Sequence, residues 1–280
     1  MCVGRPETLV HYDPIVSSGQ SNDRRRHDPF EGVDAAGMIV TGATRSAVPA
    51  LFEPLLTETI AAMPADVGLY IYGSVATGQA TTKMSDVDLL TVGMPRSDAA
   101  KLSSRLTSRY SDLCRAVEIG PAQLEDFVGD HDEAYGMRVF LRHYCVHLTG
   151  PAQPVGPPFP ADTHAARGFN GDIAQHAERW MQQLDDREPA DLARAVARKT
   201  LLAVAGLVSI HDATWTTDRR TAATRWAAIE PTSADGMSLL TEWSQTTPNV
   251  TTADVRNALL TTVRHVVYHF DQRIGLWAQS

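Results

Sequence analysis

Apolar positions in the first half of the chain alternate between helical spacing and short continuous runs. Apolar residues that recur every three or four positions are typical of an amphipathic helix, whereas a short apolar run bounded by polar turns is typical of a strand. Helical spacing occurs at residues 50–63, 98–114 and 132–142. The runs predict strands at residues 67–72, 87–92, 115–119 and 144–148. The pattern therefore predicts a small domain in which helices cover a mixed sheet.

After residue 150 the pattern becomes helical throughout. A proline-rich connector at residues 151–160 separates the two halves, as is typical of a domain boundary. The helices expected beyond it cover residues 169–184, 191–211, 217–228, 233–244 and 255–274. The second of these is nearly apolar all round after Leu201, which is typical of a central bundle helix. We therefore predict an α+β fold, with a small mixed-sheet domain at residues 46–150 and an all-helical bundle domain at residues 161–280.

The first 45 residues lack any such periodicity and are rich in Gly, Ser, Asp and Arg. We predict that residues 1–45 form a poorly ordered N-terminal extension. Met38 stands just before the first convincing element. Translation that starts at Met38 and a genuine flexible tail are both consistent with the sequence.

Composition narrows the function classes. The net charge is −8, and 43% of the 280 residues are hydrophobic. No apolar run approaches the roughly 20 residues of a membrane-spanning helix, and Cys2, Cys114 and Cys145 lack the spacing of a zinc site. We expect a cytoplasmic monomer that binds neither a membrane nor nucleic acid, because the chain lacks a basic footprint. An acidic surface attracts cationic substrates.

The most informative segment runs from residue 69 to residue 92. An apolar run ends in Gly73-Ser74, and a polar loop then leads to Asp86-Val87-Asp88 at the start of the next run. Residues i and i+2 of a strand point to the same side, so Asp86 and Asp88 would converge. Paired carboxylates suit hard divalent cations, and a Gly-Ser turn lets backbone N–H groups approach a phosphate. The segment therefore predicts metal-dependent nucleotide chemistry.

This arrangement resembles the signature of the nucleotidyltransferase superfamily, which includes the polymerase-β-like enzymes. The resemblance implies transfer of a nucleoside monophosphate, with two Mg²⁺ ions that clamp the attacking and leaving oxygens. Asp86 and Asp88 would hold those ions. Gly73 and Ser74 would cradle the β- and γ-phosphates, and Ser85 would add a hydroxyl contact.

Such a centre needs a third carboxylate, either as a metal ligand or as the base that takes the acceptor's proton. Glu118 lies on the next expected strand, which would pair beside Asp88. Because Val and Ile flank it, we expect Glu118 to be dehydrated, as suits a general base. Asp112 and Glu125 are weaker rivals and are expected to be solvated surface charges.

A closer resemblance is to the streptomycin/spectinomycin adenylyltransferases, carried by Ser-Asp-x-Asp at 85–88 and Arg-Ala-Val-Glu at 115–118. It covers about residues 50–230 and is strong only from 69 to 119. It implies transfer of AMP from Mg·ATP to a hydroxyl of an aminoglycoside, and hence antibiotic resistance. It also implies Arg220, before a Trp-Ala pair, as a nucleotide contact.

One departure leaves the acceptor open. That family begins its second bundle helix with acidic residues that bind the drug, whereas this chain has Ala197-Arg198-Lys199-Thr200 there. An acidic cluster occurs earlier, at Asp185, Asp186, Glu188 and Asp191. Either this cluster substitutes from a shifted position, or the acceptor is a protein or an RNA, as in nucleotidyltransferase toxins and regulators.

Other polar residues of the second half are weaker candidates. Arg198, Lys199 and Arg219 would be triphosphate ligands only if they face the cleft, because most basic residues on helices are solvated. His265 and His269 have the i, i+4 spacing of metal ligands but lack a third ligand, so a structural role is favoured.

Overall fold

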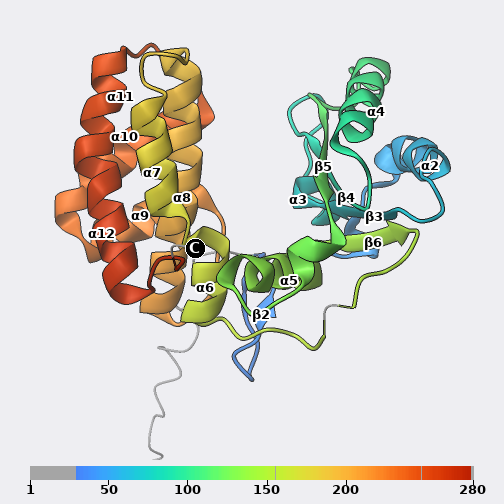
Figure 1. Ribbon diagram of the computed structural model, residues 1–280, viewed down its shortest axis with the longest axis horizontal. Coiled ribbons are helices and arrows are strands. Elements are labelled where there is room, and N and C mark those ends of the chain that lie inside the picture. The colour runs from blue at the N-terminus through green and yellow to red at the C-terminus, as the bar shows by residue number, and fades with distance from the viewer. Residues whose placement is uncertain (1–29, 155, 247, 279–280) are drawn as a thin grey trace, which may run out of the picture.

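A four-stranded mixed sheet forms the centre of the first half (Figure 1). The computed structural model describes residues 30–154, 156–246 and 248–278. Strand β3 (Gly68–Tyr72) pairs antiparallel with β4 (Val87–Val92) and with β6 (Val146–Thr149), and β4 pairs parallel with β5 (Val117–Ala122). The strand order is β5-β4-β3-β6.

Helices cover both faces of this sheet. On one face, α2 (Glu53–Ala61) and α4 (Arg96–Arg109) contribute Leu55 and Leu106 to a buried apolar core with the strands. On the other face, α5 (Asp132–Tyr144) and the 3₁₀ turn η4 (Leu124–Phe127) pack against Leu90. The turn after β3 forms one short helix, α3 (Gly73–Ala76). Alternation along β4 sends Val87 and Leu89 into the first core and leaves Asp88 on the opposite face.

The second half is a helical bundle with its own apolar core. Its elements are α6 (Thr163–Asn170), α7 (Ile173–Gln182), α8 (Pro189–Asp212), α9 (Arg219–Ile229), η5 (Pro231–Ser233), α10 (Ala234–Gln245), α11 (Thr252–Ala258), the π-helical turn η6 (Leu259–Val263) and α12 (Arg264–Arg273). Helix α8 is the central one, and its residues from Leu201 onward are almost all buried. The predicted α+β fold class is confirmed, whereas the residue limits of the two domains remain a prediction.

Several predicted element boundaries were wrong. The helix expected at 169–184 is two helices that are separated at residues 171–172. A Cβ at Gly171 would overlap the ring of Trp277. Helix α4 begins at Arg96 rather than at residue 98, and it ends at Arg109 rather than at residue 114. Strand β5 starts at Val117 and continues to Ala122. These differences reflect tertiary contacts, which local periodicity does not encode.

Residues 30–44, which we call the strap, correct the prediction of a poorly ordered extension to residue 45. The strap contains the two-residue strands β1 (Gly32–Val33) and β2 (Ile39–Val40), which pair with each other. It is hydrogen-bonded to both halves: Ala161 N donates to Gly37 O at 3.0 Å, and Thr44 N donates to Ala76 O at 3.0 Å. Residues 1–29 lie outside the described residues. A chain starting at Met38 would lack the first eight strap residues, 30–37.

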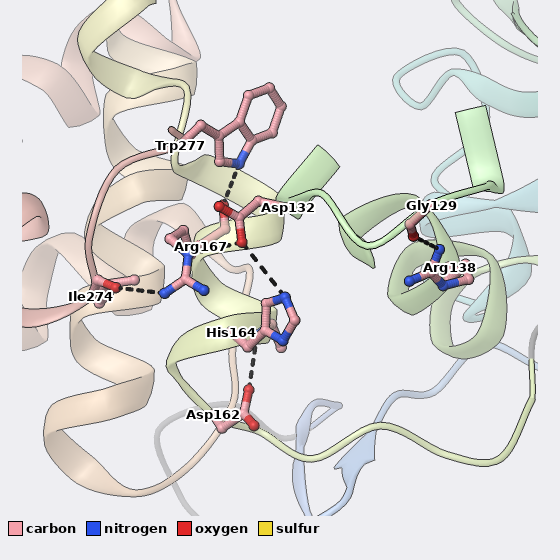
Figure 2. Close-up of polar contacts among 9 residues, drawn as sticks. Gly129, Asp132, Arg138, Asp162, His164, Arg167, Ile274 and Trp277 are labelled. Carbon is pink, nitrogen blue, oxygen red and sulfur yellow. Dashed lines mark hydrogen bonds and ion pairs between the residues drawn. The ribbon is translucent and has the colours of Figure 1, made fainter. Parts of the chain in front are cut away.

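Helices α5 and α6 join the two halves of the molecule. Gly136 and Gly168 let their backbones touch, and a Cβ at either position would overlap the other helix. Figure 2 shows the polar contacts beside this crossing. Asp132 accepts from Arg167 Nε at 2.8 Å, and Trp277 Nε1 donates to the carbonyl of Arg167 at 2.7 Å. The crossing therefore fixes how the bundle sits on the sheet domain.

Substituting Gly168 with Ala should destabilise the protein. Its Cβ would lie 2.8 Å from Gly136 Cα, and backbone atoms cannot move aside cheaply. Overpacking of this kind costs about 1–3 kcal/mol, which a lower urea midpoint would reveal. Gly32→Ala is the matched control, because a Cβ at residue 32 has nothing within 4 Å. An unchanged midpoint for Gly168→Ala would contradict the close packing of α5 and α6.

Candidate functional site

Three carboxylates gather at one end of the sheet. Asp88 of β4 lies opposite Glu118 of the parallel strand β5, and Tyr72 of β3 lies opposite Asp88 on the other side. Residues that face each other across paired strands project to the same side of the sheet. Asp86 precedes β4 by one residue and shares the side of Asp88. The structure thus brings together Asp86, Asp88 and Glu118.

Gly73 allows the turn after β3 to approach Asp88 closely. Its φ is +70°, a left-handed conformation that favours glycine. A Cβ at this position would also overlap Asp88 Oδ2. Ser74 follows immediately and lines a cavity next to the turn. The predicted phosphate-binding turn is therefore adjacent to the carboxylates.

The pKa of Asp88 is strongly shifted by its surroundings. Burial raises the pKa of Asp88 from 3.8 to about 6, and repulsion from Glu118 and Asp86 adds to the rise, while Arg115 and Arg219 oppose it. The pKa of Tyr72 is also raised, mainly by burial and then by the charge of Asp88. The site therefore carries more negative charge than its own cations neutralise.

Glu118 differs from its expected environment. The side chain is exposed rather than dehydrated between its apolar neighbours. Val117 and Ile119 point to the opposite face of β5 because side chains alternate along a strand. It is Asp88, and not Glu118, whose pKa is raised by burial.

Asp86 is held by an ion pair. Arg115 Nε donates to Asp86 Oδ1 at 2.9 Å, and Arg115 Nη2 contacts Asp86 Oδ2. This two-pronged geometry is the stronger form of arginine–carboxylate pairing. Arg115 and Glu118 come from the same Arg-Ala-Val-Glu segment, which thus supplies both a counter-ion and a carboxylate.

The donor set fits a divalent cation in its chemistry. Asp86, Asp88 and Glu118 offer only carboxylate oxygens, which Mg²⁺ prefers. Burial, and then repulsion from Glu118 and Asp86, raise the pKa of Asp88, and a bound cation would oppose both effects. Within the described residues, no group of three or more His, Cys, Asp or Glu side chains is already gathered for a metal. Arg115 engages Asp86 in this structure, so a cation bound there would compete with Arg115 for the Asp86 carboxylate.

A cavity of about 1000 Å³ extends from Asp88 to the helical bundle, and Asp86 and Glu118 do not line it. The sheet domain contributes Asp88 and Gly73, and α9 contributes Arg219 and Arg220. Aromatic side chains form much of the remaining wall, namely Tyr72, Phe140, Tyr144, Phe169 and Trp277. A second cavity of about 550 Å³ shares Gly73 and Arg219 and also includes Ser74. The two cavities therefore adjoin at the Gly73 turn, next to Asp88.

Arg219 is the bundle cation best placed for that position. Its guanidinium is largely buried, and its Nε has no hydrogen-bond partner among the described residues. Burial, and then repulsion from Arg198, lower the pKa of Arg219, while Asp218 and Asp88 oppose the change. A buried N–H group without a partner is costly unless an acceptor binds it. Arg220 also lines the larger cavity but is exposed.

Other sequence candidates lie elsewhere. Lys199 forms an ion pair with Asp172 at 2.6 Å. Ser85 Oγ accepts from Thr81 N at 2.9 Å and lines neither cavity, so it shapes the loop before β4. The acidic cluster also lines neither cavity, and its first member, Asp185, pairs with Arg256 at 3.8 Å. His265 and His269 contact each other edge to face, with a distance of 4.4 Å between their ring centroids.

Three site residues were missed at the level of sequence. Glu133 and Trp277 line the larger cavity, and Glu31 lines the smaller one. Trp277 and Glu31 come from opposite ends of the chain, and no local pattern indicates that they approach the site. Glu133 lies on a predicted helix, but its direction depends on the α5–α6 crossing.

Comparison with protein families agrees with this geometry. Residues 56–133 match the family model of the nucleotidyltransferase domain. The match spans β3, α3, β4 and β5, and so includes all three carboxylates and the Gly73 turn. No curated protein matches the chain. Across the part of the chain that the structure describes, helices long and apolar enough to cross a membrane are absent. Residues 56–133 are therefore similar to a nucleotidyltransferase domain, and this similarity supports transfer of a nucleoside monophosphate in general terms.

Proposed function

We propose that this chain uses its nucleotidyltransferase domain to transfer AMP from Mg·ATP to a hydroxyl of an aminoglycoside of the streptomycin or spectinomycin type, with release of pyrophosphate. One observation carries the proposal. Asp88 lines the same cavity as the Gly73 turn and Arg219, and Glu118 lies opposite Asp88 on the neighbouring strand. Carboxylates for a metal, a turn for phosphate and a cation for the triphosphate thus meet in one place.

Each residue has a role in the in-line displacement. Gly73, Ser74, Arg219 and Arg220 would bind the triphosphate. Asp86 and Asp88 would hold Mg²⁺, which supplies Lewis-acid stabilisation of the attacking and leaving oxygens. The acceptor oxygen forms a bond to the α-phosphorus as the bond to the β-phosphate oxygen breaks, and Glu118 takes the hydroxyl proton.

The cavity supports a small acceptor. Its volume of about 1000 Å³ is that of a pocket for a nucleotide-sized or drug-sized molecule. Once Asp88 serves the metal, Glu133 and Asp218 are the carboxylates left along its wall for an ammonium group. This low number supports an acceptor with few ammonium groups. The aromatic wall would pack against its rings and cations.

A radiolabel experiment tests the proposal. The purified chain is incubated with Mg²⁺ and ATP labelled at the α- or the γ-phosphate, and with streptomycin, spectinomycin or cell lysate. The proposal requires that the α-label, and not the γ-label, appears on a drug. Expression in a drug-sensitive bacterium should raise resistance, and Asp86→Ala should erase that gain. Labelling of a lysate protein or RNA, with every drug unlabelled, would replace the aminoglycoside with a macromolecular acceptor.

Glu118→Gln separates a base from a metal ligand. If Glu118 takes the proton, the variant should bind Mg·ATP normally and lose about 10²–10⁴-fold in turnover, the usual contribution of general-base catalysis. Calorimetry gives the ATP affinity, and the α-label assay gives turnover. Glu125→Gln is the matched control, because Glu125 is also exposed and lines neither cavity. Loss of ATP affinity together with turnover would make Glu118 a metal ligand instead.

A further inference from the structure

The strap forms part of the wall of the smaller cavity. Phe30, Glu31 and Ala43 line it opposite Gly73 and Ser74. The strap also touches the phosphate-binding turn directly, because Thr44 N donates to Ala76 O at the end of α3. The nucleotide side of the site is therefore completed by residues that precede the matched nucleotidyltransferase segment.

Glu31 grips the loop that leads into α9. Both of its carboxylate oxygens accept hydrogen bonds from Thr217: Oε1 accepts from Thr217 Oγ1 at 2.8 Å, and Oε2 accepts from Thr217 N. Tyr144 is buried beside this pair, and its hydroxyl accepts from Trp215 Nε1 at 2.7 Å. These contacts bury the Glu31–Thr217 pair in a polar network between the strap, α5 and the bundle.

Thr217, the residue that Glu31 holds, lies two residues before Arg219. Asp218 separates Thr217 from Arg219 and caps α9, since its Oδ1 accepts from Thr221 N at 2.7 Å. Thr216, on the other side, is held to α8 through Ser209. The loop is thus fixed at consecutive residues, and the position of the buried Arg219 side chain at the first turn of α9 follows from that fixation.

We propose that Glu31 is a positioning residue that acts through Thr217 to hold Arg219 against the triphosphate of a bound nucleotide. This inference rests on the proposed function. A bidentate carboxylate satisfies two donors at once, and its loss would leave Thr217 N without that partner and free the loop to shift. A small displacement of a guanidinium matters, because its hydrogen bonds to phosphate depend on a planar, directional fork.

The test compares nucleotides that differ only in their phosphates. Calorimetry on the full chain would give dissociation constants for Mg·ATP and for adenosine. Glu31→Ala should weaken Mg·ATP binding about tenfold or more, on the order of one charge-assisted hydrogen bond, and leave adenosine binding unchanged. Glu31→Gln, which keeps one oxygen for Thr217 N, should retain most of the affinity. If Glu31→Ala does not fold, Thr217→Val takes its place in the test. Because this variant removes a single hydroxyl, it should lose less Mg·ATP affinity than is expected for Glu31→Ala.

A double-mutant cycle decides whether the effect passes through Arg219. In an Arg219→Gln background, Glu31→Ala should cause no further loss of ATP affinity. Asp34→Ala is the matched control, because Asp34 lies on the strap and its side chain accepts hydrogen bonds from Ala36 N and Met38 N within its own turn. Equal losses for ATP and adenosine, or losses that add fully to that of Arg219→Gln, would overturn the proposal. Absence of ATP binding by the unmodified chain would instead contradict the proposed function.

Discussion

Asp88→Asn should abolish nucleotidyl transfer and, at the same time, stabilise the folded protein at neutral pH. The loss of activity follows from the metal site. Asp88 is half-buried and lies between Tyr72 and Glu118 across the sheet. An amide lacks the charge that holds Mg²⁺, and losing the metal clamp should remove at least several kcal/mol of transition-state stabilisation.

The gain in stability follows from the pKa of Asp88. Folding raises that pKa from 3.8 to about 6, so the folded state binds the proton more tightly than the unfolded chain does. At pH above about 6 the carboxylate is charged in both states, and the folded state carries the whole penalty. At about 1.4 kcal/mol per unit of pKa, this penalty is on the order of 2–3 kcal/mol. It disappears as the pH falls below about 4, where both states are protonated.

Urea denaturation at several pH values checks this linkage. The free energy of unfolding of Asp88→Asn should exceed that of the unmodified chain at pH 7, and the two should converge near pH 4. Asp112→Asn is the control for removing an aspartate, because Asp112 is fully exposed beside Lys83. A variant that is less stable at pH 7, or one that turns over normally, would remove Asp88 from the centre of the site.

The catalytic end of the sheet could be predicted because its information is local. Two apolar runs with a Gly-Ser turn and an Asp-x-Asp step define β3, β4 and the side of the sheet to which Asp86 and Asp88 point. The Arg-Ala-Val-Glu segment then placed Glu118 beside Asp88 by strand pairing alone. The prediction that Glu118 is dehydrated was wrong, because alternation along β5 leaves its side chain exposed despite its apolar neighbours.

The other side of the site depends on contacts between distant segments. The direction of Glu133 follows from the Gly136–Gly168 crossing, and Glu31 reaches Thr217 only because the strap spans both halves. No periodicity encodes either contact. The acidic cluster at 185–191 shows the converse: four carboxylates close in sequence to an expected cleft line neither cavity. The sequence shows which charged residues a helix has, but the packing of the helices determines which of those side chains line a cavity.

For Arg219 and Arg220, the sequence and the structure favour different residues as the main triphosphate contact. The resemblance to adenylyltransferases implied Arg220 as the nucleotide contact. The structure shows both residues at the cavity, but only Arg219 is largely buried and influenced by Asp88. A buried guanidinium binds phosphate in a medium where its charge is weakly screened, whereas an exposed one is weakened by water and salt. We therefore expect the larger share of triphosphate binding from Arg219.

Arg219→Gln should raise the KM for ATP by at least tenfold, and Arg220→Gln should raise it less and in a salt-dependent manner. Removing one partner of a desolvated charge pair typically costs about 2–5 kcal/mol, most of which appears as lost binding. The measurement is the KM for ATP of both variants at low and at high salt, with the KM for the acceptor as the internal control. The loss in Arg219→Gln should persist at high salt because the group is buried, while the smaller loss in Arg220→Gln should shrink. If Arg220→Gln shows the larger and salt-independent loss, the triphosphate lies on the exposed side of α9, and Arg219 is a structural cation that balances Asp88.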